Sequence, residues 1–311
     1  MATIVAAMAT SHAFAFMDPS GWDEFLQRNR QGYRRRYGTL PEMGAEFARE
    51  TEEGNAARYR HVSEAHDHLQ RELHERRPDV LLLIGDDQNE HYHADNIPQI
   101  AVYTGGDFVT APDGPAYKSG AQTARLLLSR LVEDGFDVSI CGQFAKDRLI
   151  AHAHVGVLHR FVRDHDIPVV PIFVNGIHVP ALEPFRCHAL GRAMRAIIEN
   201  DLPRDMRVAV IASGGLSHFT AGYPWPDYRG PFRYGDICVD FDQSLIAAMK
   251  RGDGESLARL KSDDLLLHGG IEFRCWLVTL GMVGDRPLEL MAYEPFYRAI
   301  MGVGVGRWNV A

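Results

Sequence analysis

Histidine residues stand at the ends of apolar stretches in this chain, where they could bind a metal ion or move protons. His12 follows the apolar residues 3–8, and His218 closes the segment Ser-Gly-Gly-Leu-Ser-His that follows the apolar residues 208–212. Neutral imidazole is a common metal ligand, and it exchanges protons near neutral pH. In α/β sheets, reactive groups collect where strands end and open onto a crevice. These positions predict a metal-dependent catalytic site.

Polar residues also follow two other apolar runs. Residues 86–93, Asp-Asp-Gln-Asn-Glu-His-Tyr-His, come after the apolar run 79–85, and His152 and His154 lie beyond the short apolar run 138–141. A lone histidine is more often a structural residue than a ligand. Each of these histidine positions is therefore weak evidence by itself, and only the group together favours a functional site.

The glycine pair before His218 is the strongest local signal. Gly214 and Gly215 follow a strand-like run and permit a tight turn with positive φ, which can direct His218 into a crevice. The plainer interpretation is an ordinary strand–helix turn with Ser217 as the helix N-cap. The segment lacks the Gly-x-Ser-x-Gly pattern of a hydrolase nucleophile elbow, and the chain carries no Walker loop or Gly-x-Gly-x-x-Gly turn after a strand.

Composition and charge exclude several classes of protein. The 311 residues carry a net charge of −8, which argues against nucleic-acid binding, since that needs concentrated positive charge. No apolar run approaches the roughly eighteen residues of a membrane span. The four cysteines form no close pair, so they are expected to be reduced. We expect a cytoplasmic protein with no membrane or nucleic-acid partner.

A basic cluster interrupts the acidic background. Arg28, Arg30 and residues 34–36, Arg-Arg-Arg, lie within a charged, helix-prone segment at about residues 22–76. A solvated helix face or a subunit contact is the usual explanation for such a run. The arginines could also meet a substrate carboxylate. The long charged segment suggests a homo-oligomer.

Apolar runs alternate with amphipathic stretches along the whole chain. This alternation predicts an α/β fold: a single domain, residues 1–311, with a central mixed, largely buried sheet covered by helices on both faces. The expected strands are residues 3–8, 79–85, 97–103, 138–141, 169–174 and 208–212. The expected helices after the charged segment are residues 121–133, 152–163, 190–200, 241–251, 256–260 and 271–279. The glycine-rich tail from Gly302 is expected to be irregular.

A set of ordered landmarks resembles the class III extradiol ring-cleaving dioxygenases, the family that includes protocatechuate 4,5-dioxygenase beta subunit, gallate dioxygenase and 2,3-dihydroxyphenylpropionate 1,2-dioxygenase. The landmarks are Ser11-His12, the acidic strand end before Asn96-Ile97-Pro98, His152, Val174-Asn175, Ser213 to His218, and Gly270-Ile271-Glu272 followed by Trp276. They cover most of the chain, and their order and spacing carry the resemblance.

The resemblance implies an Fe(II) cofactor held by two histidines and a carboxylate, with open positions for a catecholate and O2. His12 matches the first histidine and Glu272 the carboxylate. Gln88 occupies the position of the second histidine, and its side-chain oxygen could coordinate the metal. Glu90, His91 or His93 could supply that contact instead. His61, in the helical part of the charged segment, is a further alternative.

The resemblance also implies roles for two histidines that do not bind metal. His218 matches the acid–base residue, for which histidine is suited because its pKa lies near neutrality. His152 matches a histidine associated with oxygen and the substrate hydroxyl, although Ala151 stands where the family has Asp. His154 is an alternative two residues further on. The implied substrate is a small dihydroxylated aromatic or heteroaromatic ring, such as a catechol, protocatechuate, gallate or 3-hydroxy-4-pyridone, that reacts with O2.

Two other functions compete with this one. The chain also resembles the Memo-type proteins, which keep the same fold but serve as non-catalytic interaction proteins, and Gln88 is compatible with such a role. A zinc hydrolase built on the same residues is the third hypothesis. It is less favoured because the chain has no His-Glu-x-x-His pair.

Overall fold

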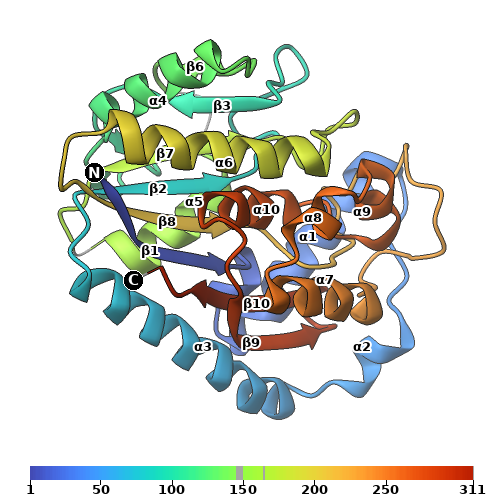
Figure 1. Cartoon of the computed structure of the whole chain (residues 1–311). Helices are drawn as coiled ribbons and strands as arrows, with labels where there is room; N and C mark the ends of the chain where they lie inside the picture. The colour runs from blue at the N-terminus through green and yellow to red at the C-terminus, as the bar shows by residue number, and fades with distance from the viewer. Residues whose placement is uncertain (145–149, 164, 311) are drawn as a thin grey trace.

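A computed structural model describes residues 1–144, 150–163 and 165–310. Within these residues, eight strands form one sheet (Figure 1). In spatial order they are β6 (Ser139–Cys141), β3 (Ile100–Tyr103), β7 (Val169–Val174), β2 (Val80–Gly85), β8 (Arg207–Ser213), β1 (Thr3–Thr10), β10 (Met301–Trp308) and β9 (Leu288–Phe296). Strands β7, β2, β8 and β1 are parallel neighbours, whereas β10 runs antiparallel to β1 and β9. The predicted α/β fold with a mixed sheet is confirmed.

The sheet is buried on both faces, as strand β2 illustrates. Val80, Leu82 and Ile84 belong to one apolar cluster, and Leu81 and Leu83 belong to another. The first cluster packs against α4 (Ala121–Glu133), α6 (Pro184–Asp201), α7 (Val239–Arg251), α8 (Gly254–Ala258) and α10 (Phe273–Met282). The second packs against α1 (Trp22–Tyr37), α3 (Glu52–Glu75) and α5 (His152–Val157). Because side chains alternate along a strand, a continuous apolar run fills both cores.

Shorter elements connect this framework. They are the 3₁₀ turns η1 (Ala13–Phe16) and η2 (Pro19–Gly21), α2 (Ala45–Arg49), the hairpin strands β4 (Phe108–Val109) and β5 (Ala116–Tyr117), the π-helical turn η3 (Leu158–Val162), and α9 (Ser262–His268). The helix predicted over 152–163 is thus α5 followed by a π-helical turn. The charged segment at about 22–76 is helical apart from the connections around α2.

The prediction of an irregular glycine-rich tail was wrong. Residues from Met301 form β10, which lies between β1 and β9. Its glycines alternate with buried Val303 and Val305, so the glycines share one face of the strand. A Cβ on Gly304 would lie 3.0 Å from the Trp276 ring. The glycines therefore let a strand pass beneath a large side chain, and they do not mark disorder.

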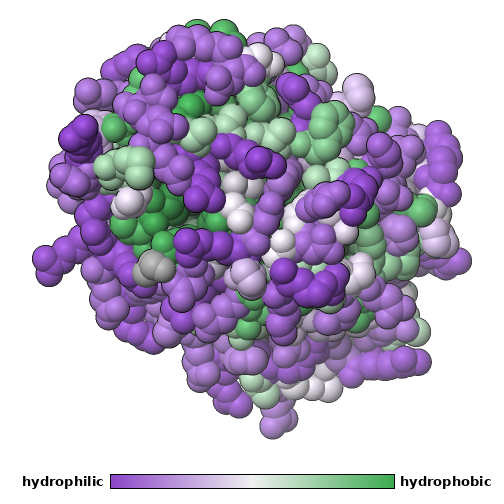
Figure 2. Space-filling model, viewed as in Figure 1, coloured by the Kyte–Doolittle hydropathy of each residue, from purple (hydrophilic) through white to green (hydrophobic). Residues whose placement is uncertain are grey.

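Of the helices that the structure describes, none is long and apolar enough to cross a bilayer. Hydrophilic residues cover most of the face shown in Figure 2, with smaller hydrophobic groups among them.

The parallel strands determine where polar chemistry gathers. Because β1, β2 and β8 run in the same direction, their carboxyl ends meet at one edge of the sheet. His12 lies just beyond β1, Asp86 to Glu90 follow β2, and Gly214 to His218 follow β8. Three segments that are far apart in the sequence therefore converge at this edge.

Candidate active site

His12 is buried at the end of β1, next to the carboxylate of Glu272. Its Nε2 lies 3.5 Å from Glu272 Oε2, and its Nδ1 lies 3.4 Å from the hydroxyl of Ser213. Ser213 donates its own proton to the Ala153 carbonyl, so His12 Nδ1 is the donor to Ser213 and Nε2 keeps its lone pair. Burial lowers the pKa of His12 to about 4. A neutral imidazole with a free Nε2 is the form that binds metal.

The backbone next to His12 turns sharply. Ala13 has a φ of 53°, in the left-handed region that is uncommon for residues other than glycine. Ala13 is the first residue of the 3₁₀ turn η1, after β1 has ended at Thr10. Strained residues of this kind often occur at functional sites.

Glu272 is the carboxylate at the centre of the site. It is fully buried where α10 begins, and its Oε1 accepts hydrogen bonds from His218 Nε2 (3.0 Å) and Gln88 Nε2 (2.8 Å). Within the described part of the chain, its Oε2 has no hydrogen-bond partner. Burial by itself would raise the pKa of Glu272, but His218 and His12 hold it well below the ordinary value. The group is therefore an ionised carboxylate with one oxygen available to a cation.

Asp86, the first residue after β2, was not predicted as a ligand. Its carboxylate is fully buried, and neither oxygen has a hydrogen-bond partner among the residues that the structure describes. Burial and the charge of Glu272 raise its pKa well above the ordinary value. Ligand atoms of His12, Asp86 and Glu272 all lie within 4.8 Å of one another. Buried polar atoms are nearly always satisfied, so two orphaned carboxylate oxygens beside a neutral imidazole fit a metal cation. The sequence signal was an acid directly after an apolar strand.

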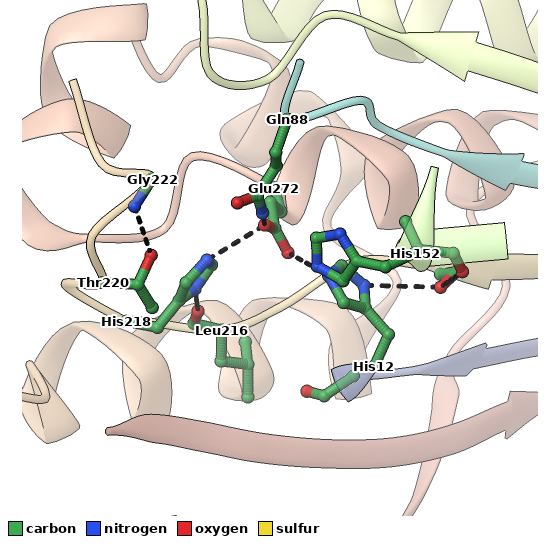
Figure 3. A network of polar contacts seen from close by, with 12 residues as sticks. His12, Gln88, His152, Leu216, His218, Thr220, Gly222 and Glu272 are labelled. Atoms are coloured by element: carbon green, nitrogen blue, oxygen red, sulfur yellow. Dashed lines mark hydrogen bonds and ion pairs between the residues drawn. The ribbon is translucent and has the colours of Figure 1, made fainter. Parts of the chain in front are cut away.

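Gln88 reaches the site with its amide nitrogen toward Glu272. The same side chain places its oxygen against Gly222, where a Cβ would lie only 2.5 Å away. Figure 3 shows Gln88, His218 and His12 arranged around Glu272. Gln88 therefore holds the carboxylate in place in this geometry, and its oxygen faces Gly222.

His218 is buried on the other side of Glu272. Besides the contact with Glu272, its Nδ1 donates to the Leu216 carbonyl at 2.8 Å. Burial disfavours the charged ring, but the adjacent Glu272 overcomes this and raises the pKa of His218 to about 8. Both ring nitrogens face acceptors, so the protein favours the doubly protonated form of the ring.

The glycine pair before His218 has a different role from the predicted one. Neither Gly214 nor Gly215 has positive φ, so the left-handed turn that glycines permit is not formed here. A Cβ on Gly214 would lie 2.5 Å from the Glu272 carbonyl oxygen, and one on Gly215 would lie 3.1 Å from the His218 ring. Glycine is needed here because two parts of the site approach the backbone closely. No helix follows Ser217 directly; its hydroxyl and amide bind Asp242 in α7.

His152 forms an ion pair with Glu90. His152 begins α5, and its Nδ1 contacts Glu90 Oε1. The other oxygen, Glu90 Oε2, accepts a hydrogen bond from the backbone N–H of Gln88 at 2.7 Å. The His152 ring meets the His12 ring edge to face, with centroids 4.7 Å apart. Burial opposes both charges, yet each partner favours ionisation of the other, so the pKa of His152 is raised and that of Glu90 is lowered to about 2. A carboxylate thus accompanies His152 although residue 151 is alanine.

The remaining predicted residues lie away from this cluster. His154 is buried with its Nε2 3.1 Å from the Ile172 carbonyl, and His91 packs with its Nε2 3.4 Å from Cys141 Sγ. His61 is exposed on α3. None of these three side chains, nor His93, lines the cavity described next.

A cavity of about 530 Å³ opens above the cluster. Its polar end is formed by His12, Gln88, Glu90, His152, His218 and Glu272. Its walls include Phe14, Phe25 and Met301, together with Arg35 and Arg36 from α1. A volume of this size, with apolar walls and a few convergent polar groups, suits a small organic ligand.

Comparisons with known proteins point to the same chemistry. Residues 46–306 match the protein family described as the catalytic LigB subunit of aromatic ring-opening dioxygenase. Gallate dioxygenase of Pseudomonas putida is 30% identical over 176 residues, which cover 54% of this chain and 47% of that protein. A 2,3-dihydroxyphenylpropionate/2,3-dihydroxicinnamic acid 1,2-dioxygenase of Dechloromonas aromatica is 30% identical over 155 residues, or 48% of this chain and 46% of that protein. The chain thus spans about half the length of these two relatives.

Other matches cover a larger part of both chains. The corresponding 1,2-dioxygenase of Rhodococcus globerulus is 27% identical over 291 residues, covering 78% of this chain and 89% of that protein. The crystal structure of an uncharacterized protein from Escherichia coli K12 superposes with a TM-score of 0.50 at 13% identity, covering 98% of this chain and 100% of the other. This last similarity concerns the fold alone.

Proposed function

The chain belongs to the family of the catalytic LigB subunit of aromatic ring-opening dioxygenase, and from this premise we propose that it is an Fe(II)-dependent extradiol dioxygenase. Its substrate would be a small ring with two adjacent oxygens, and both atoms of O2 would enter the ring-opened product. The relatives support this substrate class, because their names refer to gallate, 2,3-dihydroxyphenylpropionate and 2,3-dihydroxicinnamic acid, which all carry adjacent ring hydroxyls.

The observation that carries the proposal is the cluster of His12, Asp86 and Glu272, in which His12 and Glu272 line the polar end of the cavity. We assign the metal to these three residues, with Gln88 holding Glu272 through its amide. One imidazole and two carboxylates differ from the two-histidine, one-carboxylate set that the resemblance implies, but all three groups are ligands that suit iron. When bound, Fe(II) supplies the redox chemistry that lets O2 react with an electron-rich ring.

The protein side chains would manage the protons. His218 lines the cavity next to Glu272, so it is placed to exchange a proton with a substrate hydroxyl. His152, held by Glu90, lies on the His12 side and is placed to donate to an oxygen atom there. The apolar walls from Phe14, Phe25 and Met301 would exclude water from the ring.

The test is anaerobic loading with Fe(II), followed by addition of O2 and a diol. The panel is catechol, protocatechuate, gallate and 3-hydroxy-4-pyridone, with oxygen uptake and the ring-opened product as readouts. We expect one or more of these to consume O2 and to yield a product carrying both atoms of labelled O2. Stoichiometrically bound iron with no turnover on any member would overturn the proposal and favour a non-catalytic member of the fold.

A further inference from the structure

One wall of the cavity comes from a single face of α1. Phe25, Asn29, Gly32 and Arg36 are spaced by three or four residues, so they lie on one stripe of the helix, and Arg35 lies beside them. All five residues line the cavity. The basic run that looked like a solvated helix face therefore contributes part of its charge to the active-site cavity.

This wall is fixed to the loop that follows His218. Asn29 Oδ1 accepts hydrogen bonds from the Ala221 amide (3.1 Å) and from Tyr234 Oη (2.8 Å). Arg36 Nη1 donates to the Ala221 carbonyl at 2.8 Å. The helix is thus bound to the segment that carries the acid–base candidate, and its side chains have a defined position relative to the site.

Arg35 differs from the adjacent Arg36 in the contacts of its guanidinium. In the part of the chain that the structure describes, Arg36 is engaged with Ala221, whereas Arg35 makes no hydrogen bond or ion pair. The carboxylates of the cavity, Glu90 and Glu272, are occupied at the polar end by histidines. A cation that lines a cavity without a protein partner is available to an anionic group of the ligand.

We propose that Arg35 binds a carboxylate on the substrate and selects ring diols that carry an acidic substituent. This inference rests on the proposed function, since the diol oxygens would face His12 and Glu272 while the substituent points toward α1. Guanidinium suits this role because its planar donors match the two oxygens of a carboxylate. The cavity of about 530 Å³ has space for a ring together with such a substituent.

The experiment compares an acid with its neutral counterpart. Fe(II)-loaded protein is titrated without O2 with 3,4-dihydroxybenzoate and with 3,4-dihydroxybenzamide, in the wild type and in Arg35→Gln. We expect the wild type to bind the acid more tightly, and Arg35→Gln to weaken binding of the acid by roughly ten- to hundredfold. Binding of the amide should change by less than about twofold, because it makes no charged contact.

Arg28→Gln is the matched control. Arg28 lies on the same helix, has the same charge and is exposed like Arg35, but it pairs with Glu24 at 3.7 Å and does not line the cavity. Its substitution should leave both affinities unchanged. The proposal is overturned if acid and amide bind equally to the wild type, if neither binds, or if Arg28→Gln weakens acid binding as much as Arg35→Gln does.

Failure of the proposed function would look different. In that case O2 uptake would be absent for every diol, while the preference for the acid and its loss in Arg35→Gln would persist in the anaerobic titration. The Arg35 assignment would then stand as a carboxylate-binding site without ring cleavage.

Discussion

At the scale of single residues, the site is organised around one buried carboxylate. Glu272 Oε1 accepts from His218 and Gln88, and its Oε2 faces His12. The three neighbours therefore differ in what they contribute, since His12 offers a lone pair, His218 offers a proton, and Gln88 holds the carboxylate. The unpartnered oxygens of Asp86 complete a set of groups that a cation would satisfy.

Substitutions at Asp86 and Gln88 should distinguish the two candidates for the third ligand. We expect Asp86→Asn to lower the affinity for Fe(II) by roughly ten- to hundredfold, because a carboxylate oxygen that faces His12 and Glu272 is lost. Gln88→Ala should retain most of the metal, since in this structure its amide only orients Glu272. Iron content after gel filtration measures both. Greater metal loss in Gln88→Ala than in Asp86→Asn would assign the ligand to Gln88.

His218→Gln should separate proton transfer from metal binding. The glutamine keeps a donor toward Glu272 but cannot exchange a proton near neutral pH, so kcat should fall by roughly 10²- to 10⁴-fold with iron content unchanged. His61→Gln is the control, because His61 is exposed on α3 and lies outside the cavity. Equal turnover in wild type and His218→Gln would remove His218 from the mechanism.

At the scale of elements, close backbone contacts determine which residues are glycine. Helices α6 and α10 pack so tightly that a Cβ on Gly191 would lie 1.9 Å from the Val278 carbonyl oxygen. Likewise, a Cβ on Gly281 would lie 2.3 Å from the His188 carbonyl oxygen. Since Glu272 immediately precedes α10, this packing also fixes the position of the central carboxylate.

Gly191→Ala should therefore destabilise the protein, although alanine is the better helix former. The new methyl group meets backbone atoms that cannot move aside, so the free energy of unfolding should fall by about 1–3 kcal/mol. Gly32→Ala is the matched control in α1, where a Cβ would lie 3.7 Å from Ala221 Cβ, an ordinary contact; it should raise stability by about 0.5–1 kcal/mol. Urea denaturation measures both, and equal effects of the two substitutions would contradict a special role for Gly191 in helix packing.

At the scale of the whole molecule, the sheet lies between two apolar cores, and polar groups are buried in them as well. His66 of α3 is buried in one of them, with Nε2 2.8 Å from the hydroxyl of Thr10 and its ring against Phe16. Burial lowers the pKa of His66 to about 3. The folded protein therefore keeps this ring neutral at pH values where the unfolded chain would protonate it.

His66 should make stability depend on pH. Between the unfolded pKa of about 6.5 and the folded pKa of about 3, the unfolded state binds more protons, so stability falls as the pH falls. Asp87 and Asp242, whose pKa values are raised to about 6, act in the opposite direction, so the measurement is a difference between two proteins. From pH 6.5 to 5, wild-type stability should fall by about 1–2 kcal/mol more than that of His66→Phe. Parallel pH profiles in urea denaturation would refute the assignment.

The amino-acid sequence by itself determined the fold class, the alternation of strands and helices, and the convergence of His12, Glu272 and His218 through a family resemblance. The fold class and the alternation are local features, because apolar runs can be read from neighbouring residues, whereas the grouping of the three site residues came from the order of the family landmarks. Only the tertiary structure decided that the tail from Met301 is a strand, that Gly214 and Gly215 serve close contacts, and that Arg35 lines the cavity.

The choice of the third metal ligand shows why some features could be predicted from the sequence and others required the tertiary structure. The adjacent residues of the strand end at 86–88 look equally suitable in sequence. Yet the Asp86 carboxylate has no hydrogen-bond partner in residues 1–144, 150–163 and 165–310, while Gln88 donates to Glu272, 184 positions away. Which side chain turns toward the metal position depends on contacts between segments that meet only after folding. Periodicity and composition carry no information about such contacts, so the strand end was predictable and its ligand was not.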